Sequence, residues 1–258
     1  MQHQTPNPFD SARLADGYAT ARPAVHPRVI SLVRQHLNWE RKANTALDVG
    51  CGAGLSTAPL STLAHRCFGI EPSVEMLLRS PLVAPGARFA AGAAEALPIE
   101  SGAIDLMTCA GSLNWADLSK FFPEARRVLA PRGRLVIYDF AQGANSPSTA
   151  ALAGWHAEFK GRWPSPPCQR IVPAELPLAA HGLRLDHQEP FDVSLTVSRD
   201  FYLRYAMTET NVEDAIARGV AEEEIRDWCS ATLEPVFAGE AREIVFRGFV
   251  AYASRSSA

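Results

Sequence analysis

The sequence predicts an α/β fold, a doubly wound and mostly parallel seven-stranded sheet with helices on both faces and a helical cap over its C-terminal edge. Three observations predict it. Short apolar runs alternate with amphipathic segments between residues 45 and 140, as expected when helices cross between parallel strands. A glycine-rich turn follows the first run. A mainly helical segment then separates two later strand-like runs, 190–198 and 241–253.

The first half of the chain supplies most of the predicted strands. Pro27 can open a helix, because the first turn leaves amides unpaired anyway, and Val29, Ile30, Val33 and Leu37 follow at helical spacing. Residues 45–50 predict a buried strand, and 51–64 a glycine-rich turn that runs into a helix. Further strands are expected at 67–71, 88–91, 104–110 and 134–140. Ser73 is a typical helix N-cap, and 118–129 has the apolar spacing of another helix.

The pattern changes after Phe140. Residues 149–160 are expected to be helical, and the proline-rich stretch 163–168 to be a non-helical linker, because proline fixes φ and lacks an amide donor. Residues 200–238 predict three short helices. Asn211 is the expected N-cap of the middle one, and Glu222–Glu224 complement the N-terminal dipole of the third.

Composition excludes several classes of protein. The 258 residues are 47% hydrophobic and 21% charged, which is ordinary for a globular chain. The net charge of -3 lacks the basic excess of nucleic-acid binders. Five cysteines without a C-x-x-C pair, and seven histidines without H-E-x-x-H, predict free thiols and no metal site.

The sequence also bears on location. The N-terminal stretch MQHQTPNPFD lacks the basic and apolar regions of a signal peptide. No apolar run approaches the roughly 18–20 residues that span a bilayer. We therefore expect a cytoplasmic protein with no membrane partner.

The most informative segment is LDVGCGAG at 47–54. Gly50 and Gly52 allow the backbone to approach a ligand, and Gly54 allows close packing on the strand. Leu55 stands where dinucleotide-binding proteins have their third glycine, which disfavours an NAD site. Glu71 ends the next strand, 17 residues after Gly54. Its carboxylate can accept hydrogen bonds from both hydroxyls of a ribose, as in other nucleotide-binding α/β folds.

Taken in order, five segments resemble the Rossmann-like (class I) S-adenosylmethionine-dependent methyltransferases. They are DVGCGAG at 48–54, GIEPS at 69–73, GAAEALP at 92–98, IDLMTCAGSLNWAD at 104–117 and LAPRGRLVIYDF at 129–140. The stretch PFDSARLADGYATARPAVHP at 8–27 resembles small-molecule enzymes near the trans-aconitate and ubiquinone-biosynthesis groups. The resemblance covers residues 9–140 and implies S-adenosylmethionine as cofactor, S-adenosylhomocysteine as product and a small-molecule acceptor.

The resemblance also implies which residues bind the cofactor. Glu71 would hold the ribose, the backbone of Gly50 and Gly52 would face the cofactor, and Asp48 would orient the glycine loop or the amino group. Arg22 would bind the methionine carboxylate. Since Ala93 stands where many relatives have aspartate, the adenine amino group would fall to Glu95 or to backbone. The other expected contacts are Tyr18, Cys51, Pro72, Met76, Ala94, Cys109 and Ala110.

The acceptor side is marked by weaker signals. Asn114 and Trp115 follow the fourth strand, where relatives place side chains near the transferred methyl group, and His156 is a candidate base. Aromatic candidates for the acceptor pocket are Trp115, Tyr138, Trp155, Tyr202 and Tyr205. Arg170 and Arg204 could hold an anionic acceptor. For each of these residues, ordinary packing or a solvated surface position is the structural alternative.

The predicted organisation has four segments. They are an N-terminal cap and first helix (1–40), a cofactor-binding core (41–140), an acceptor-side cap with strand six (141–240) and a final strand (241–258). The leading hypothesis is methyl transfer to a small molecule by in-line displacement. The alternatives are a methyltransferase for protein or RNA, and a catalytically silent regulatory protein that binds S-adenosylmethionine. An NAD-dependent oxidoreductase ranks last, and the oligomeric state is not determined.

Overall fold

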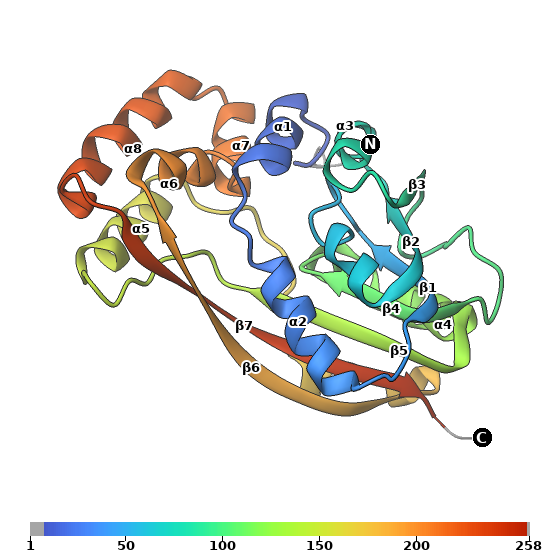
Figure 1. Ribbon diagram of the computed structural model, residues 1–258. Coiled ribbons are helices and arrows are strands. Elements are labelled where there is room, and N and C mark those ends of the chain that lie inside the picture. The colour runs from blue at the N-terminus through green and yellow to red at the C-terminus, as the bar shows by residue number, and fades with distance from the viewer. Residues whose placement is uncertain (1–7, 257–258) are drawn as a thin grey trace. The chain divides into compact units, whose positions relative to one another are not determined.

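The computed structural model describes residues 8–256, so most of the N-terminal segment on which the signal-peptide expectation rests lies outside the described residues. The chain forms two compact units (Figure 1). Unit 1 contains residues up to Ala24, Ala141–Pro167 and Asp192–Arg247. Unit 2 contains Val25–Phe140, Cys168–Phe191 and the residues from Gly248 onward.

One seven-stranded sheet organises unit 2, with the strand order β3-β2-β1-β4-β5-β7-β6. Five strands pair in parallel, namely β1 (Ala43–Val49), β2 (Ala64–Glu71), β3 (Arg88–Ala91), β4 (Ile104–Ala110) and β5 (Leu129–Phe140). β7 (Arg242–Arg255) is antiparallel to β5, and β6 (Leu183–Val197) is the edge strand beyond it. The unit boundaries fall within β6 and β7. The predicted mostly parallel, seven-stranded sheet is confirmed.

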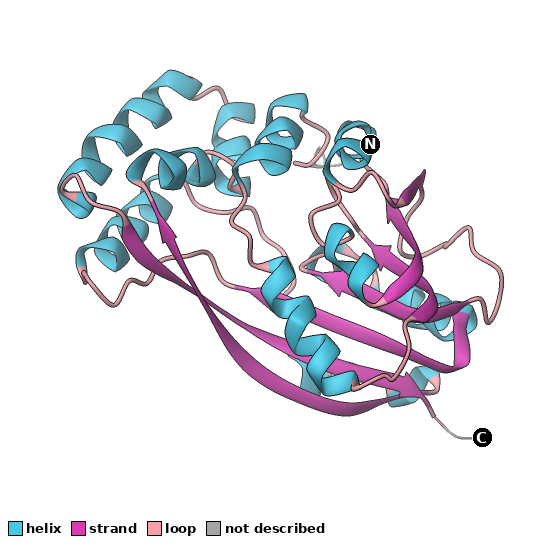
Figure 2. Ribbon diagram, in the orientation of Figure 1, coloured by secondary structure: helices cyan, strands magenta, loops and turns pink. Residues whose placement is uncertain are grey.

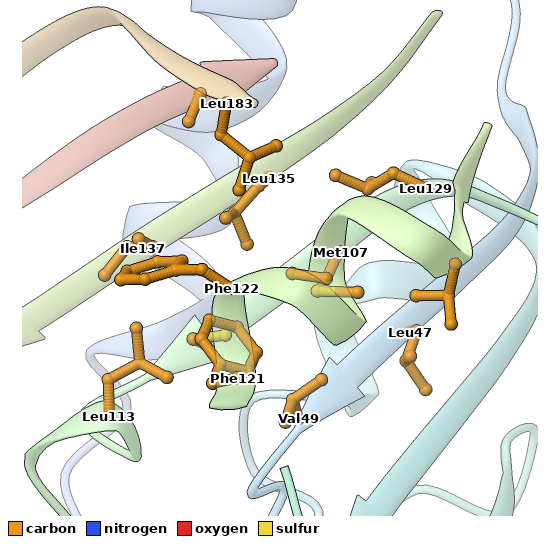
Figure 3. Packing of buried hydrophobic residues seen from close by; sticks show 14 of the residues in the cluster. Leu47, Val49, Met107, Leu113, Phe121, Phe122, Leu129, Leu135, Ile137 and Leu183 are labelled. Carbon is orange, nitrogen blue, oxygen red and sulfur yellow. The ribbon is translucent and has the colours of Figure 1, made fainter. Parts of the chain in front are cut away.

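The two faces of this sheet carry different helices. Successive strand residues point to opposite faces, and Leu47, Met107 and Leu135 share one face with Phe121 and Phe122 of α4 (Leu118–Val128) (Figure 3). On the other face, the Tyr138 hydroxyl of β5 lies 2.9 Å from His26 Nδ1 of α2 (His26–Leu37). Helices therefore cover both faces, as predicted.

The prediction of a helix after the glycine turn is wrong. Only a short 3-10 helix, η1 (Ala58–Thr62), forms there, and β2 begins at Ala64. The hydroxyls of Ser56 and Thr57 turn inward to bind Asp48, and Pro59 has no amide donor. Side-chain hydrogen bonds of this kind compete with regular helix formation.

Other elements of unit 2 follow the sequence more closely. Ser73 caps α3 (Val74–Val83) by accepting a hydrogen bond from the Met76 amide. β5 begins five residues earlier than expected, because Leu129 pairs with Ile104 before a register shift. Three 3-10 helices complete the unit, η2 (Leu113–Trp115), η3 (Pro173–Glu175) and η4 (Ala179–His181).

Unit 1 is mainly helical (Figure 2). Its helices are α1 (Ala12–Ala21), α5 (Ala151–Arg162), α6 (Arg199–Ala206), α7 (Thr210–Ala217) and α8 (Glu222–Phe237). The last three confirm the helices predicted over 200–238. The rings of Trp155 and Phe159 stack at 5.0 Å, and Trp155 also stacks on Trp228 of α8. Aromatic packing therefore holds α5 on α8.

The predicted cap of α7 is wrong. Glu209 precedes the helix and makes no side-chain cap bond. Asn211 lies inside the helix, is buried, and donates its amide to the carbonyl of Trp163 at 3.0 Å. A buried carbonyl must find a donor, so this long-range bond takes precedence over capping.

Within residues 8–256, no helix has the length and apolar character needed to cross a bilayer.

Candidate active site

Three motifs meet at one edge of the sheet. Because β1, β2 and β4 are parallel, their carboxyl ends lie side by side, with Val49 opposite Ile70 and Asp48 opposite Thr108. The glycine turn, Glu71 and the residues after Cys109 therefore come together. Ligands of open α/β sheets bind at such an edge, where the strand order reverses.

The glycine turn and Glu71 form one hydrogen-bonded unit. Gly50 and Gly52 have φ values of 68° and 53°, a conformation that glycine adopts without strain. The Gly52 amide donates to Glu71 Oε2 at 2.9 Å, and the Ser73 amide donates to Oε1 at 3.0 Å. Glu71 is 6% exposed. Its carboxylate is thus fixed against the turn by two backbone amides.

Asp48 of β1 holds the same turn through hydrogen bonds. It is fully buried, and it accepts hydrogen bonds from Ser56 at 2.6 Å, Thr57 at 2.7 Å and Thr108 at 2.9 Å. Burial raises the pKa of Asp48, and these three hydrogen bonds oppose the rise. The network ties the turn to β1 and β4.

The two central glycines differ in what a side chain would meet. A Cβ on Gly50 would lie 2.3 Å from Ser112 Cβ, whereas no described atom lies within 4 Å of a Cβ built on Gly52. Ser112 is a site residue that the sequence analysis missed, and its hydroxyl donates to the Val49 carbonyl at 2.6 Å. Gly50 is therefore required by packing, while Gly52 borders open space.

This difference predicts separate effects of two alanine substitutions. Gly50→Ala is expected to lower the free energy of unfolding by about 3 kcal/mol, from left-handed strain plus overpacking. Gly52→Ala is expected to cost only about 1–2 kcal/mol and to weaken S-adenosylmethionine binding about tenfold (1.4 kcal/mol). Urea unfolding and titration calorimetry check both, and equal stability losses would contradict the assignment.

The other predicted cofactor contacts of unit 2 differ in exposure. Met76, Cys51 and Cys109 are buried, Ala94 and Ala110 are half-buried, and Pro72 is exposed. Burial raises the pKa of the Cys51 and Cys109 thiols, so both are neutral. Glu95 Oε1 accepts a hydrogen bond from the Asp117 amide at 2.6 Å. The Glu95 carboxylate is thus engaged at the start of α4.

Asn114 has an unusual environment at the ends of β4 and β5. Its Nδ2 donates to Asp139 Oδ2 at 3.0 Å, and Asp139 Oδ1 accepts from the Phe140 amide at 2.8 Å. Asn114 Oδ1 is buried and finds no hydrogen-bond partner in the described part of the chain. Gln169 holds this loop through the Leu113 and Ala116 carbonyls at 2.6 and 2.5 Å. Asp139 lies in the segment 129–140 but was not singled out there, and Gln169 lies in no recognisable sequence motif.

Three other acceptor candidates of unit 2 have contrasting positions. Trp115 is 41% exposed. Tyr138 is 1% exposed, and its hydroxyl is engaged by His26. Arg170 is exposed.

Unit 1 contains the remaining candidates. Arg22 Nη1 lies 2.8 Å from Glu209 Oε1 and 3.1 Å from Thr208 Oγ1, and its guanidinium lies over Tyr18 at 4.5 Å and Tyr205 at 5.0 Å. Part of its donor capacity is therefore already used.

Two of the other acceptor candidates in unit 1 donate hydrogen bonds within that unit. Tyr202 donates to the Gly143 carbonyl at 2.7 Å, and Trp155 Nε1 donates to Thr232 at 2.7 Å. Burial lowers the pKa of His156 to about 4, so its imidazole is neutral near pH 7. Arg204 is exposed.

Comparison with known proteins gives a consistent result. Residues 47–137 match the methyltransferase domain family. A candidate methyltransferase of Dictyostelium discoideum is 28% identical over 138 residues, 53% of this chain and 51% of that protein. The demethylmenaquinone methyltransferase of Mycolicibacterium gilvum is 32% identical over 154 residues, 54% of this chain and 64% of that protein.

A solved structure shares the fold. It is a type II methyltransferase candidate from Anaeromyxobacter dehalogenans, with a TM-score of 0.67 and 21% identity, covering 87% of this chain and 95% of that one. The chain spans about half the length of curated relatives such as the Dictyostelium protein, at 51%. The matched segment with its glycine turn, and the strand order of the sheet, identify residues 47–137 as a class I S-adenosylmethionine-dependent methyltransferase domain.

Proposed function

We propose that the protein transfers a methyl group from S-adenosylmethionine to a small-molecule acceptor. The observation that carries this proposal is the Glu71 carboxylate, fixed by the Gly52 and Ser73 amides beside the glycine turn. A fixed carboxylate at the end of β2 can accept both ribose hydroxyls of the cofactor. The open space at Gly52 gives the cofactor room beside this carboxylate.

The proposed contacts assign each part of the cofactor to different residues. Met76 and Ala94 would flank the adenine, with backbone at 93–95 taking its amino group, because Glu95 is engaged by Asp117. A carbonyl of Cys109 or Ala110 would accept from the methionine amino group. In unit 1, Arg22 retains donors beyond its bonds to Glu209 and Thr208. The roles of Arg22 and Tyr18 at the methionine carboxylate stay predictions of the sequence resemblance.

The proposed reaction requires the acceptor atom to be aligned with the methyl group of the cofactor. When bound, S-adenosylmethionine supplies a methyl group that its sulfonium already activates. The chain therefore has to hold the acceptor in line with that methyl group, which can contribute about 7–11 kcal/mol to lowering the barrier. A general base is needed only for an acceptor that arrives protonated.

The pair formed by Asn114 and Asp139 is the proposed acceptor-orienting site. A buried carbonyl oxygen without a donor carries a desolvation cost of about 1–3 kcal/mol, which a bound acceptor bearing an N–H or O–H group would remove. Asn114 Oδ1 is such an oxygen. Asp139 fixes the amide so that this oxygen keeps its orientation. We therefore propose an acceptor that donates a hydrogen bond next to its methylated atom.

A substitution at Asn114 tests this role. Asn114→Ala is expected to lower the rate of methyl transfer about tenfold, the effect of losing one hydrogen bond of about 1.4 kcal/mol in the transition state. The dissociation constant for S-adenosylmethionine should change less than about twofold, since ribose and adenine contacts remain. Asn44→Ala, at an exposed position of β1, is the control. A matching loss of cofactor affinity would contradict an acceptor-side role.

Two measurements test the proposed function itself. Titration calorimetry should show S-adenosylmethionine binding to the purified chain, and a folded chain without binding would contradict the proposal. Incubation with methyl-labelled cofactor and cell extract should then place label in the small-molecule fraction. Label in protein or RNA would favour the macromolecule alternative. Binding without any transfer would favour the catalytically silent alternative.

A further inference from the structure

Two imidazoles and one carboxylate gather on the edge of the sheet in unit 2. His36 lies in the last turn of α2, and His187 and Glu189 lie two residues apart on β6, so they share one face of that strand. One ligand atom from each of the three lies within 4.8 Å of the others. We propose that His36, His187 and Glu189 form a binding site for a divalent transition-metal ion.

Aromatic contacts bring these side chains together. The His36 ring stacks on His187 at 4.7 Å with an interplanar angle of 11°, and on Tyr252 of β7 at 3.8 Å. The Tyr252 hydroxyl donates to Glu189 Oε1 at 3.4 Å. Tyr252 also stacks on His187 at 6.0 Å. It therefore contacts all three ligands, two by stacking and one by a hydrogen bond, and acts as a supporting residue.

The ligand set selects the class of metal. Imidazole nitrogens suit zinc, nickel, cobalt and iron(II), and one carboxylate adds an oxygen that all four accept. Metal–nitrogen bonds of about 2.0–2.1 Å place two nitrogens of a tetrahedral site about 3.3 Å apart. The 4.8 Å cluster must therefore contract by about 1.5 Å. Both histidines are exposed, so side-chain rotations can supply this movement.

The local charge favours a cation. The carboxyl end of α2 carries a partial negative charge from its unpaired carbonyls, and Glu189 adds a full one. Asp186, also on β6, is paired with Arg184 and accepts a hydrogen bond from Ser254. Arg34 lies in the same last turn of α2, but its side chain is exposed. A bound ion would join α2 to the edge strand β6 and would protect that edge.

Metal titration of the untagged full chain, stripped with a chelator, tests the site. We expect one Co²⁺ or Ni²⁺ per chain by calorimetry, and a Co²⁺ absorption spectrum without thiolate charge transfer. His36→Gln, His187→Gln and Glu189→Gln should each weaken binding about tenfold or more. His65→Gln, at an exposed histidine of β2, and Cys168→Ser, at the exposed cysteine, are the controls and should bind as the native chain does.

The outcomes separate the proposal from its alternatives. No binding of either ion would show that the three side chains only pack together. Binding that survives all three ligand substitutions, or that is lost in Cys168→Ser, would place the ion elsewhere and overturn the proposal. Circular dichroism of each variant confirms folding, and Glu189→Gln preserves the shape of the side chain if a histidine variant misfolds. Metal binding is measured without methyl transfer, so a failure of the proposed methyltransferase function would leave the proposed metal site unaffected.

Discussion

Replacement of Glu71 by alanine is expected to weaken S-adenosylmethionine binding by at least about 100-fold. Two charge-assisted hydrogen bonds to the ribose hydroxyls would be lost, each contributing about 1.5–3 kcal/mol, and 1.4 kcal/mol corresponds to tenfold in affinity. The Gly52 and Ser73 amides would also lose their acceptor, which loosens the turn itself. Titration calorimetry with S-adenosylmethionine measures the effect.

Conservative and remote variants sharpen this test. Glu71→Gln keeps one carbonyl oxygen, so its loss of affinity should be intermediate, about tenfold. Glu100→Gln changes an exposed carboxylate and should bind as the native chain does. Cofactor affinity that is unchanged in Glu71→Ala, with the fold intact, would show that this carboxylate does not face the cofactor.

Replacement of Asp48 by alanine is expected to reduce the free energy of unfolding by about 3 kcal/mol. The substitution leaves the buried hydroxyls of Ser56, Thr57 and Thr108 without their acceptor, and each unsatisfied buried group costs about 1–3 kcal/mol, with some relief by rotation. For a chain of this size, the Tm should fall by about 6–12 °C. Differential scanning calorimetry checks this prediction, and a Tm within about 2 °C of the native value would contradict it.

Asparagine at position 48 separates charge from shape. Burial raises the pKa of Asp48 above its unfolded value, so the folded chain binds the proton more tightly than the unfolded chain does. The contribution of Asp48 to stability is therefore greatest below about pH 4 and falls as pH rises from there to the folded pKa. Asp48→Asn lacks this titration. Urea unfolding should show that the free energy of unfolding of the variant rises relative to that of the native chain as pH increases over this range. A difference that does not change with pH would contradict the raised pKa.

The sequence anticipated the parallel core well because its signals are local. Apolar runs at 45–49 and 104–110 lie in β1 and β4, and Ser73 caps α3 as its side-chain chemistry requires. The errors occurred where distant contacts compete with local preference. Ser56 and Thr57 donate hydrogen bonds to Asp48 where a helical turn was expected. Asn211 donates to the Trp163 carbonyl and does not cap α7. Neither contact is visible from spacing along the chain.

The first residues of β5 and β6 were also not predictable from local sequence. Leu129 belongs to β5 only because Ile104 lies beside it, and Leu183 begins β6 seven residues before the alternating run at 190. Pairing partners decide where a strand begins, whereas periodicity reports only which face is buried.

The sequence by itself determined the family and the sheet, and it predicted the edge at which a cofactor would bind. Its glycine spacing and Glu71 express backbone and hydrogen-bond requirements that act within a few residues of each other. Only the tertiary structure showed that Gly50 packs on Ser112 and that His36 meets His187 and Glu189. It also showed that Asn114 Nδ2 donates to Asp139, while Asn114 Oδ1 has no hydrogen-bond partner among residues 8–256. These are contacts between strands and helices far apart in the chain, and folding alone brings them within reach.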